Sequence, residues 1–140
     1  MAHFFAVSPR FWDDEKVAAW TDAQQKLALY LLTCKHRNLE GLYVLPLSYA
    51  AEDCNWSVTK TRRNMTELCK AGFCEYDETS KVVLIAKALD YYQPKSEKQL
   101  KGALNDLSSI PETGLQARFL AEAEHRAPDL YKALSNGTEL

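Results

Sequence analysis

The polar and apolar residues of positions 46–71 repeat at helical spacing and predict two helices joined by a tight turn. The first helix spans Leu47–Cys54, and Asn55 suits the turn because asparagine tolerates a left-handed backbone. The second helix begins at Ser57, a preferred N-cap residue, and ends before Gly72, a preferred residue just past a helix C-terminus. Its inward face carries Thr61, Met65 and Leu68, flanked by Val58 and Asn64.

A β-hairpin is predicted directly after these helices. Two apolar runs, Phe73–Tyr76 and Val82–Ala86, flank the polar segment Asp77–Lys81, as is typical of two strands and their turn. A further β-rich run, Gly41–Leu45, precedes the first helix and is expected to pair with the hairpin. This order of elements is typical of a winged helix-turn-helix, and the predicted fold class is mainly α with a small β-hairpin, an α+β fold.

The N-terminal part is expected to complete the core of a domain that we place at residues 1–92. His3–Val7 is interpreted as a short edge strand and Phe11–Val17 as a short helix. Residues 21–24 show the capping-box pattern, a hydroxyl followed three residues later by Glu or Gln, which predicts a helix running to about Cys34. The aromatic residues expected in the core are Phe11, Trp12 and Trp20.

Residues 93–135 are predicted to form a helical extension, and residues 136–140 a disordered tail. Lys87–Pro94 is interpreted as a connector, because Pro94 breaks any preceding helix. Two capping-box patterns and a proline mark three helix starts, at Ser96–Gln99, Thr113–Gln116 and Pro128. The one-sided apolar stripes of these helices need a partner, and two alternatives remain open: packing back onto the domain, or pairing with a second copy of the chain.

Charge limits how this chain can bind nucleic acid. Its 140 residues suit one domain with an extension, and its formal net charge is −2. A protein that coats nucleic acid without selectivity is usually basic, so a DNA-binding surface here must be a local patch. The helix that begins at Ser57 carries four basic residues against one acidic residue, an excess of three positive charges: Lys60, Arg62, Arg63 and Lys70 against Glu67.

Five short segments follow one another along the chain: FWDDEKV, YLLT, GLYVLPLSYAAEDCNWS, ELCKAGFCEYDE and QLKGALNDLSSIP. In this order they resemble the N-terminal region of phage replisome organisers, the DnaD-like replication proteins of bacteriophages and prophages. The similarity spans about residues 4–111. It implies a winged-helix domain that binds DNA at a replication origin and often self-associates, with the recognition helix at Ser57–Ala71 and the wing at Asp77–Lys81.

The resemblance also has a limit. Such proteins often carry a further C-terminal domain that engages single-stranded DNA or recruits the helicase machinery. We expect no room for that domain in this sequence, so a helicase-loading role is not carried over. Double-stranded DNA is the expected partner, together with replication proteins and with a second copy bound through the C-terminal helices.

In this interpretation the N-terminal half of the helix Ser57–Ala71 enters the major groove. Arginine can form two hydrogen bonds to guanine and asparagine two to adenine, which is why these residue types are considered for base contacts. The phosphate contacts are assigned to Lys60, Arg62 and Arg63. The base contacts are assigned to Thr59, Arg63 and Asn64. The full set of candidate DNA-binding residues is Ser57, Thr59, Lys60, Arg62, Arg63, Asn64 and Lys81, with Lys81 at the wing tip facing the minor groove or the backbone.

Two alternatives to this function use the same fold: a winged helix that serves as a protein-interaction or assembly module, and a small transcriptional regulator. No catalytic motif supports an enzyme, because the five glycines are isolated and no histidine lies in a nucleophile motif. We therefore expect neither enzyme activity nor a cofactor.

The four cysteines contain no C-x-x-C pair, so we expect buried free thiols and no metal site. The N-terminus lacks the basic and apolar regions of a secretory signal, and no stretch is long and apolar enough to span a bilayer. The expected location is the cytoplasm of a bacterial host cell, with no membrane partner.

Overall fold

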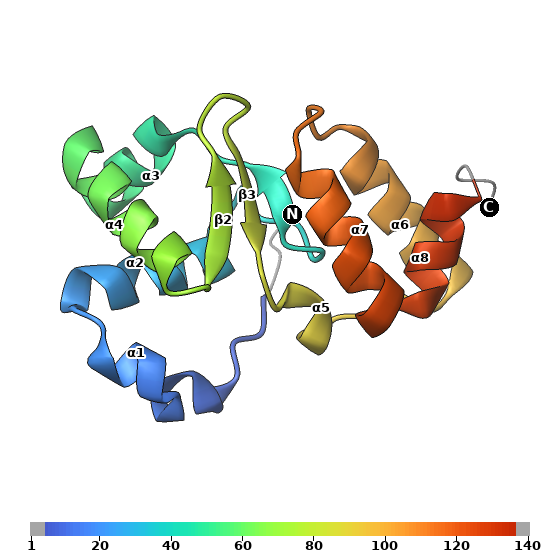
Figure 1. Ribbon diagram of the computed structural model, residues 1–140, viewed down its shortest axis with the longest axis horizontal. Helices are drawn as coiled ribbons and strands as arrows, with labels where there is room; N and C mark the ends of the chain where they lie inside the picture. The colour runs from blue at the N-terminus through green and yellow to red at the C-terminus, as the bar shows by residue number, and fades with distance from the viewer. Residues whose placement is uncertain (1–4, 137–140) are drawn as a thin grey trace.

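The computed structural model describes residues 5–136 and is mostly helical, with one small three-stranded antiparallel sheet (Figure 1). The sheet stands between two groups of helices that differ in sequence position. One group comes from the part of the chain before the hairpin, and the other from the part after it. This arrangement confirms the α+β fold class.

The helices α3 (Leu47–Cys54) and α4 (Val58–Lys70) lie where the helical spacing predicts them. Asn55 after α3 adopts the left-handed conformation, with φ 61°, so the chain can turn sharply there. At the other end of α4, Gly72 has φ 82°, and its N–H and that of Phe73 bond back to carbonyls of the last turn at 3.0 and 3.1 Å. This pair of bonds is a Schellman motif, which ends α4 and directs the chain into the hairpin.

The sheet has the strand order β1–β3–β2, with β1 at Leu42–Val44, β2 at Cys74–Asp77 and β3 at Val82–Ile85. Both pairings are antiparallel, and Leu84 lies opposite Leu42 on one side and Glu75 on the other. The strand predicted ahead of α3 therefore pairs with the hairpin as expected. All four residues of β3 are buried, because β3 is the central strand and helices cover both of its faces.

The N-terminal elements are the 3₁₀ helix η1 (Pro9–Asp13) and the α-helices α1 (Glu15–Ala19) and α2 (Asp22–Thr33). The capping box predicted for α2 is present: Thr21 Oγ1 accepts from Gln24 N at 3.2 Å, and Gln24 Oε1 accepts from Thr21 N at 2.9 Å. Helix α2 packs against α3 and α4, which makes it the first core helix of this part of the chain.

Three N-terminal predictions are corrected: the edge strand at His3–Val7, the single helix at Phe11–Val17 and the burial of Trp12. In place of the single helix, η1 and α1 are separated by Asp14, whose extended backbone and side chain cap α1. Residues 5–7 form no strand, while the rest of the predicted edge strand lies outside the described residues. Trp12 is 57% exposed, because η1 is a single surface turn that buries none of its residues. The other two aromatic residues, Phe11 and Trp20, do pack against the core as predicted.

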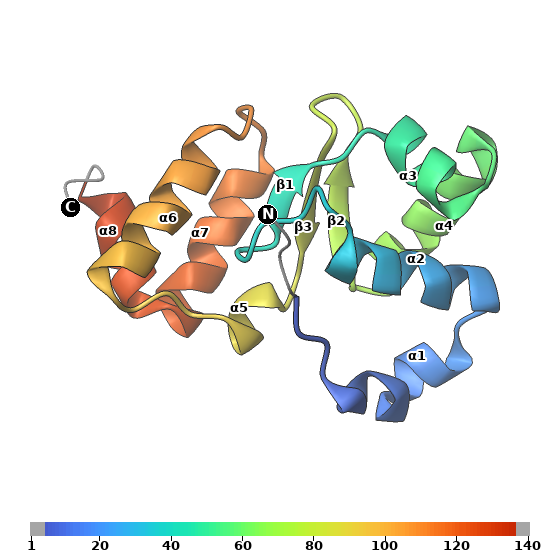
Figure 2. The same ribbon diagram turned by 180° about the vertical axis from the view of Figure 1, so that it is seen from behind.

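The C-terminal helices are α5 (Ala88–Tyr91), α6 (Glu97–Ser108), α7 (Leu115–Arg126) and α8 (Pro128–Ser135), seen together from behind in Figure 2. The predicted connector at 87–94 is wrong in part, since one turn of helix, α5, fits before Pro94. Ser96 and Gln99 form the predicted capping box of α6. Of the predicted tail, residues 137–140 lie outside the described residues.

The sheet separates two hydrophobic cores. Successive residues of a strand point to opposite faces, so Tyr43 and Val83 face α2, α3 and α4, whereas Leu42 and Leu84 face α6, α7 and α8. The second core buries Leu100, Leu104, Phe119 and Leu130 of the extension. The apolar stripes of the C-terminal helices thus pack back onto the domain, the first of the two alternatives left open above.

Polar contacts also attach α7 to the hairpin and to α5. Arg118 pairs with Glu75 of β2 at 2.9 Å, and Arg126 pairs with Asp90 of α5 at 3.2 Å. The capping box predicted at Thr113 is only half formed: its N–H bonds to Gln116 Oε1, but its hydroxyl donates to Asp77 Oδ2 in the hairpin at 2.5 Å. The tertiary contact with β2 therefore replaces the local one.

A buried carboxyl group lies in the loop before β1. Glu40 is 1% exposed, and one of its carboxyl oxygens has no hydrogen-bond partner among residues 5–136. Burial, reinforced by the negative charge of Asp106 in α6, raises the pKa of Glu40 from 4.5 to about 8. The folded chain therefore favours the protonated acid. As pH rises from 4.5 to about 8, Glu40 ionises in the unfolded chain but stays protonated in the folded chain, so the free energy of unfolding falls over this range.

Replacing Glu40 by Gln is accordingly expected to stabilise the chain at pH 8 by on the order of 2–4 kcal/mol and to change little at pH 4. The amide keeps the shape of the protonated acid and carries no charge. Urea unfolding at both pH values measures the difference. Glu97→Gln, at an exposed position on α6, is the matched control and is expected to show no such gain with pH. A gain in stability at pH 4 as large as at pH 8 would contradict the raised pKa of Glu40.

Candidate nucleic-acid interface

Helix α4 lies on the side of the molecule away from α6–α8 (Figure 1), and part of its surface is polar and exposed. Its inward residues are Thr61, Asn64, Met65 and Leu68, all buried. Its exposed residues include Thr59, Arg62, Arg63, Thr66 and Lys70. Ser57 caps the helix as predicted, because its Oγ accepts from Lys60 N at 3.1 Å.

Two lysines meet at the turn between α3 and α4. Lys60 Nζ lies 5.0 Å and Lys26 Nζ lies 5.4 Å from the ring centre of Trp56, so both are within cation–π range. Lys26 comes from α2 and also donates to Cys54 O at 2.9 Å. Sequence reasoning missed Lys26, because it is exposed on a different helix and no local pattern connects it with α4.

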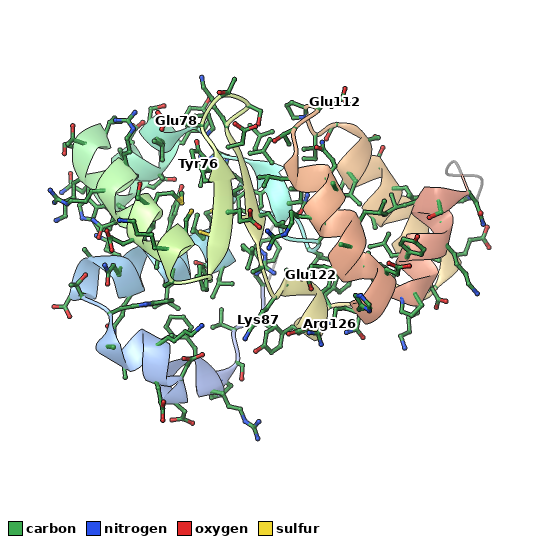
Figure 3. The ribbon with its side chains drawn as sticks, in the orientation of Figure 1. Tyr76, Glu78, Lys87, Glu112, Glu122 and Arg126 are labelled. Carbon is green, nitrogen blue, oxygen red and sulfur yellow. The ribbon has the colours of Figure 1, made fainter. Side chains whose placement is uncertain are left out.

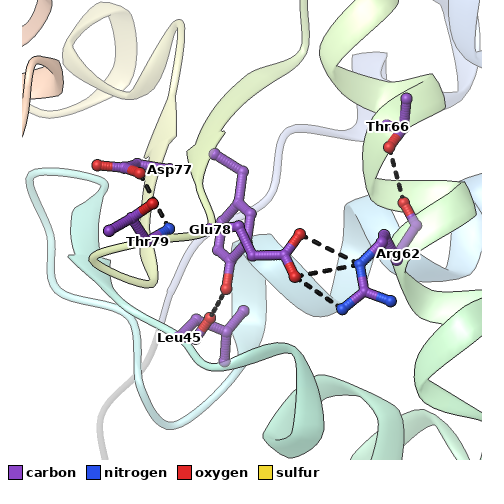
Figure 4. A network of polar contacts seen from close by, with 7 residues as sticks. Leu45, Arg62, Thr66, Asp77, Glu78 and Thr79 are labelled. Carbon is purple, nitrogen blue, oxygen red and sulfur yellow. Dashed lines mark hydrogen bonds and ion pairs between the residues drawn. The ribbon is translucent and has the colours of Figure 1, made fainter.

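Arg62 is already bound by a carboxylate of the hairpin turn. Its guanidinium donates to both carboxyl oxygens of Glu78, at 2.7 Å in the shortest contact (Figure 4). The pair holds the pKa of Glu78 below and that of Arg62 above its ordinary value, chiefly through these hydrogen bonds. The predicted phosphate contact of Arg62 is therefore conditional, since a phosphate would have to displace Glu78.

Asn64 does not belong to the exposed surface. It is 7% exposed and its side-chain amide donates to Lys60 O within α4 at 2.9 Å. Helical phase places it beside Thr61 and Met65, on the side that packs against the core. The assignment of Asn64 to a base edge is therefore wrong.

The hairpin turn is acidic rather than basic. Lys81 is exposed with φ 61°, and its N–H bonds to Asp77 O at 2.7 Å, which closes the turn. Asp77 accepts from Thr79 N and from the Ser80 hydroxyl, and Figure 3 shows Glu78 on the hairpin and Glu112 on the neighbouring loop. Lys81 is the basic residue of the turn, against the carboxylates of Asp77 and Glu78, and the cation that pairs with Glu78 is Arg62 of α4. The hairpin turn by itself therefore supplies little attraction for a phosphate backbone.

The surface that remains is the α4 basic face, which we define by Lys26, Thr59, Lys60, Arg63 and Lys70. Lys70 pairs with Glu67 at 3.6 Å on an exposed surface, where such contacts are weak. Arg63 and Lys60 form no ion pair with any residue between 5 and 136. These cations lie on one helix, with Lys26 beside its N-terminus.

Other kinds of site find little support in the part of the chain that the structure describes. Residues 5–136 contain no group of three or more His, Cys, Asp or Glu side chains that could hold a metal ion. Three cysteines are buried, as predicted, but Cys69 is only half-buried. Among the described helices, none has the length and apolar character needed to cross a membrane.

Comparisons with protein-family models, with curated proteins and with solved structures found no match to this chain.

Proposed function

We propose that this chain binds double-stranded DNA as a winged helix-turn-helix protein. The observation that carries the proposal is the α4 basic face: a cationic, exposed helix surface that directly follows a helix and a left-handed turn and directly precedes a hairpin. In helix-turn-helix domains the helix at this position lies in the major groove, with its N-terminal residues nearest the bases. Thr59 and Arg63 are the side chains that would reach base edges.

The other cations have a supporting role in this proposal. Lys60 and Lys26 flank Trp56 at the N-terminal end of α4 and would contact phosphates on either side of the groove. Arg62 would join them only when Glu78 releases it, which makes its contribution conditional. Lys81 could approach the backbone from the hairpin turn, where neighbouring carboxylates weaken its attraction.

The biological setting of the proposal is the initiation of phage or prophage DNA replication in a bacterial host cell. The ordered resemblance to replisome organisers between about residues 4 and 111 supports this setting, with replication proteins as further partners. Binding at an operator, as a small transcriptional regulator, would use the same surface on a different DNA site. A second copy of the chain would have to dock elsewhere than on the apolar stripes of α6–α8, which the second core covers.

A second candidate function is protein docking, with no enzyme activity in either case. Tyr49 on α3 is 49% exposed and stacks on His36 at 5.2 Å between ring centres, and Leu39 is 41% exposed nearby in the chain. Exposed aromatic residues are enriched at protein interfaces. The acidic hairpin turn also suits a basic protein partner better than it suits DNA.

Fluorescence anisotropy of labelled duplex DNA, titrated with the full chain over a salt series, tests the proposal. With about four phosphate contacts, the log–log plot of affinity against salt should have a slope near −4. A random duplex and an origin-derived duplex, compared at the same salt, separate general from site-specific binding. No binding by the folded chain at low salt would reject DNA binding and favour the docking function.

A further inference from the structure

Two of the four cysteines touch where α4 meets β2. Cys69 belongs to the last turn of α4 and Cys74 begins β2, and their Sγ atoms lie 3.8 Å apart. The Schellman turn at Gly72 brings them together, because it reverses the chain between the helix and the strand. The other two cysteines, Cys34 and Cys54, are buried, and the Cys34 thiol donates to the Tyr43 hydroxyl.

The two thiols of this pair have different environments. Cys69 is half-buried, whereas Cys74 is 1% exposed and also lies 3.9 Å from Met65 Sδ. A sulfur–sulfur hydrogen bond joins the two thiols, and it lowers the pKa of Cys69, while the same bond and burial raise the pKa of Cys74. Cys69 is thus the sulfur better able to react as a thiolate, and Cys74 is in position to react with it next.

We propose that Cys69 and Cys74 form a redox modification site, at which a peroxide oxidises the two thiols to an intramolecular disulfide. Nothing in the DNA-binding proposal requires this pair, so the two can be tested separately.

The reaction balances in two steps with hydrogen peroxide as the oxidant. In the first step the Cys69 thiolate attacks one peroxide oxygen, an S–O bond forms, the O–O bond breaks, and the leaving hydroxide takes a proton to become water. In the second step Cys74 attacks the Cys69 sulfur, the S–S bond forms, and the S–O bond breaks. The departing hydroxide takes the Cys74 proton as a second water, so two electrons pass from the thiols to the peroxide.

The two sulfurs already lie close to bonding distance. A disulfide needs the two sulfurs about 2.05 Å apart, so they must approach by less than about 2 Å from their present contact. Gly72, between the cysteines, has no atom within 4 Å of the place where a Cβ would stand. The bond would join the last turn of α4 to the first residue of β2.

Peptide mapping of the native chain tests the site directly, because the sequence places a trypsin site between the two cysteines. The chain is treated with hydrogen peroxide, the peroxide is removed, and the chain is then denatured in the presence of iodoacetamide, so that buried thiols are blocked as well. The blocked chain is digested with trypsin. Cleavage after Arg63, Lys70 and Lys81 leaves Cys69 in residues 64–70 and Cys74 in residues 71–81. We expect these peptides to appear as one cross-linked species that dithiothreitol separates, and the blocked thiols to fall from four to two, since the disulfide uses two.

The matched variants are Cys69→Ser, which is expected to lose the cross-link, and Cys54→Ser, which is expected to keep it. The wild-type map is decisive by itself if either variant folds poorly. Retention of all four free thiols would overturn the proposal, as would Cys69 oxidised to sulfinic acid without a cross-link. A disulfide that uses Cys34 or Cys54 would overturn it equally.

Discussion

Alanine at both Lys60 and Arg63 is expected to lower the affinity of the chain for duplex DNA by about 10–100-fold at low salt. Both side chains lie on the α4 basic face, and neither is held by a carboxylate among residues 5–136. Removing them should also make the salt slope less steep by about 2, one for each lost phosphate contact. Fluorescence anisotropy over a salt series gives both numbers, and circular dichroism confirms that the variant is folded.

A matched variant removes the same charge from another surface. Lys95 lies just before α6 and Lys98 lies within it, and both are exposed. The double variant Lys95→Ala with Lys98→Ala lowers the net charge by the same amount, on a surface other than that of α4. Equal loss of affinity in both double variants would mean that overall charge, and not the α4 basic face, attracts the DNA.

Glu78→Gln is the complementary variant, because it removes the charge that holds Arg62. The released guanidinium should strengthen binding by several-fold and steepen the salt slope by about 1. The pair is exposed, so its loss should cost little stability. Unchanged affinity in Glu78→Gln would exclude Arg62 from the DNA surface.

Alanine at Gly41 is expected to destabilise the fold by about 3–5 kcal/mol, since it combines backbone strain with a steric clash. Gly41 has φ 79°, and a Cβ there would lie 2.4 Å from the Cβ of Ala88, the first residue of α5. Its carbonyl also accepts from Ile85 N at 2.8 Å beside the β1–β3 pair, so the backbone cannot move away freely. Thermal unfolding should show a midpoint lower by about 10–20 °C.

Gly102→Ala is the control for this substitution. Gly102 lies within α6, is exposed, and has no atom within 4 Å of a Cβ position. The same change should therefore stabilise the chain by about 0.5–1 kcal/mol, because alanine favours a helix over the unfolded chain. A similar loss at both glycines would contradict the argument from φ and from the contact with Ala88.

Local signals in the sequence were sufficient to predict most element boundaries. Ser57, Asn55 and Gly72 each act on a few neighbouring backbone groups, so their effect does not depend on the rest of the fold. The capping boxes at Thr21 and Ser96 are equally local, and both are present. The capping box at Thr113 failed for a tertiary reason, since Asp77 in the hairpin accepts the hydroxyl that would have capped α7.

The candidate site was predictable to the extent that helical phase determines it. The helical spacing along α4 correctly placed Thr59 and Arg63 on the exposed side. The same spacing, applied strictly, places Asn64 on the buried side and so excludes it from the candidate DNA-binding residues. Neither the Glu78 contact with Arg62 nor the position of Lys26 beside Trp56 could be inferred in this way. Each joins residues from elements that only folding brings together.

The sequence by itself determined the order and type of the main elements, because capping, turn geometry and hydrophobic period act over fewer than about ten residues. The tertiary structure decided how the C-terminal helices are partnered. From the sequence, their apolar stripes could pack equally well on a second copy or on the same chain. In the structure they pack on the face of β3 that carries Val82 and Leu84. The tertiary structure likewise decided which cations of α4 are left without an ion pair among the described residues, because a charge is neutralised by neighbours in space and not by neighbours in sequence.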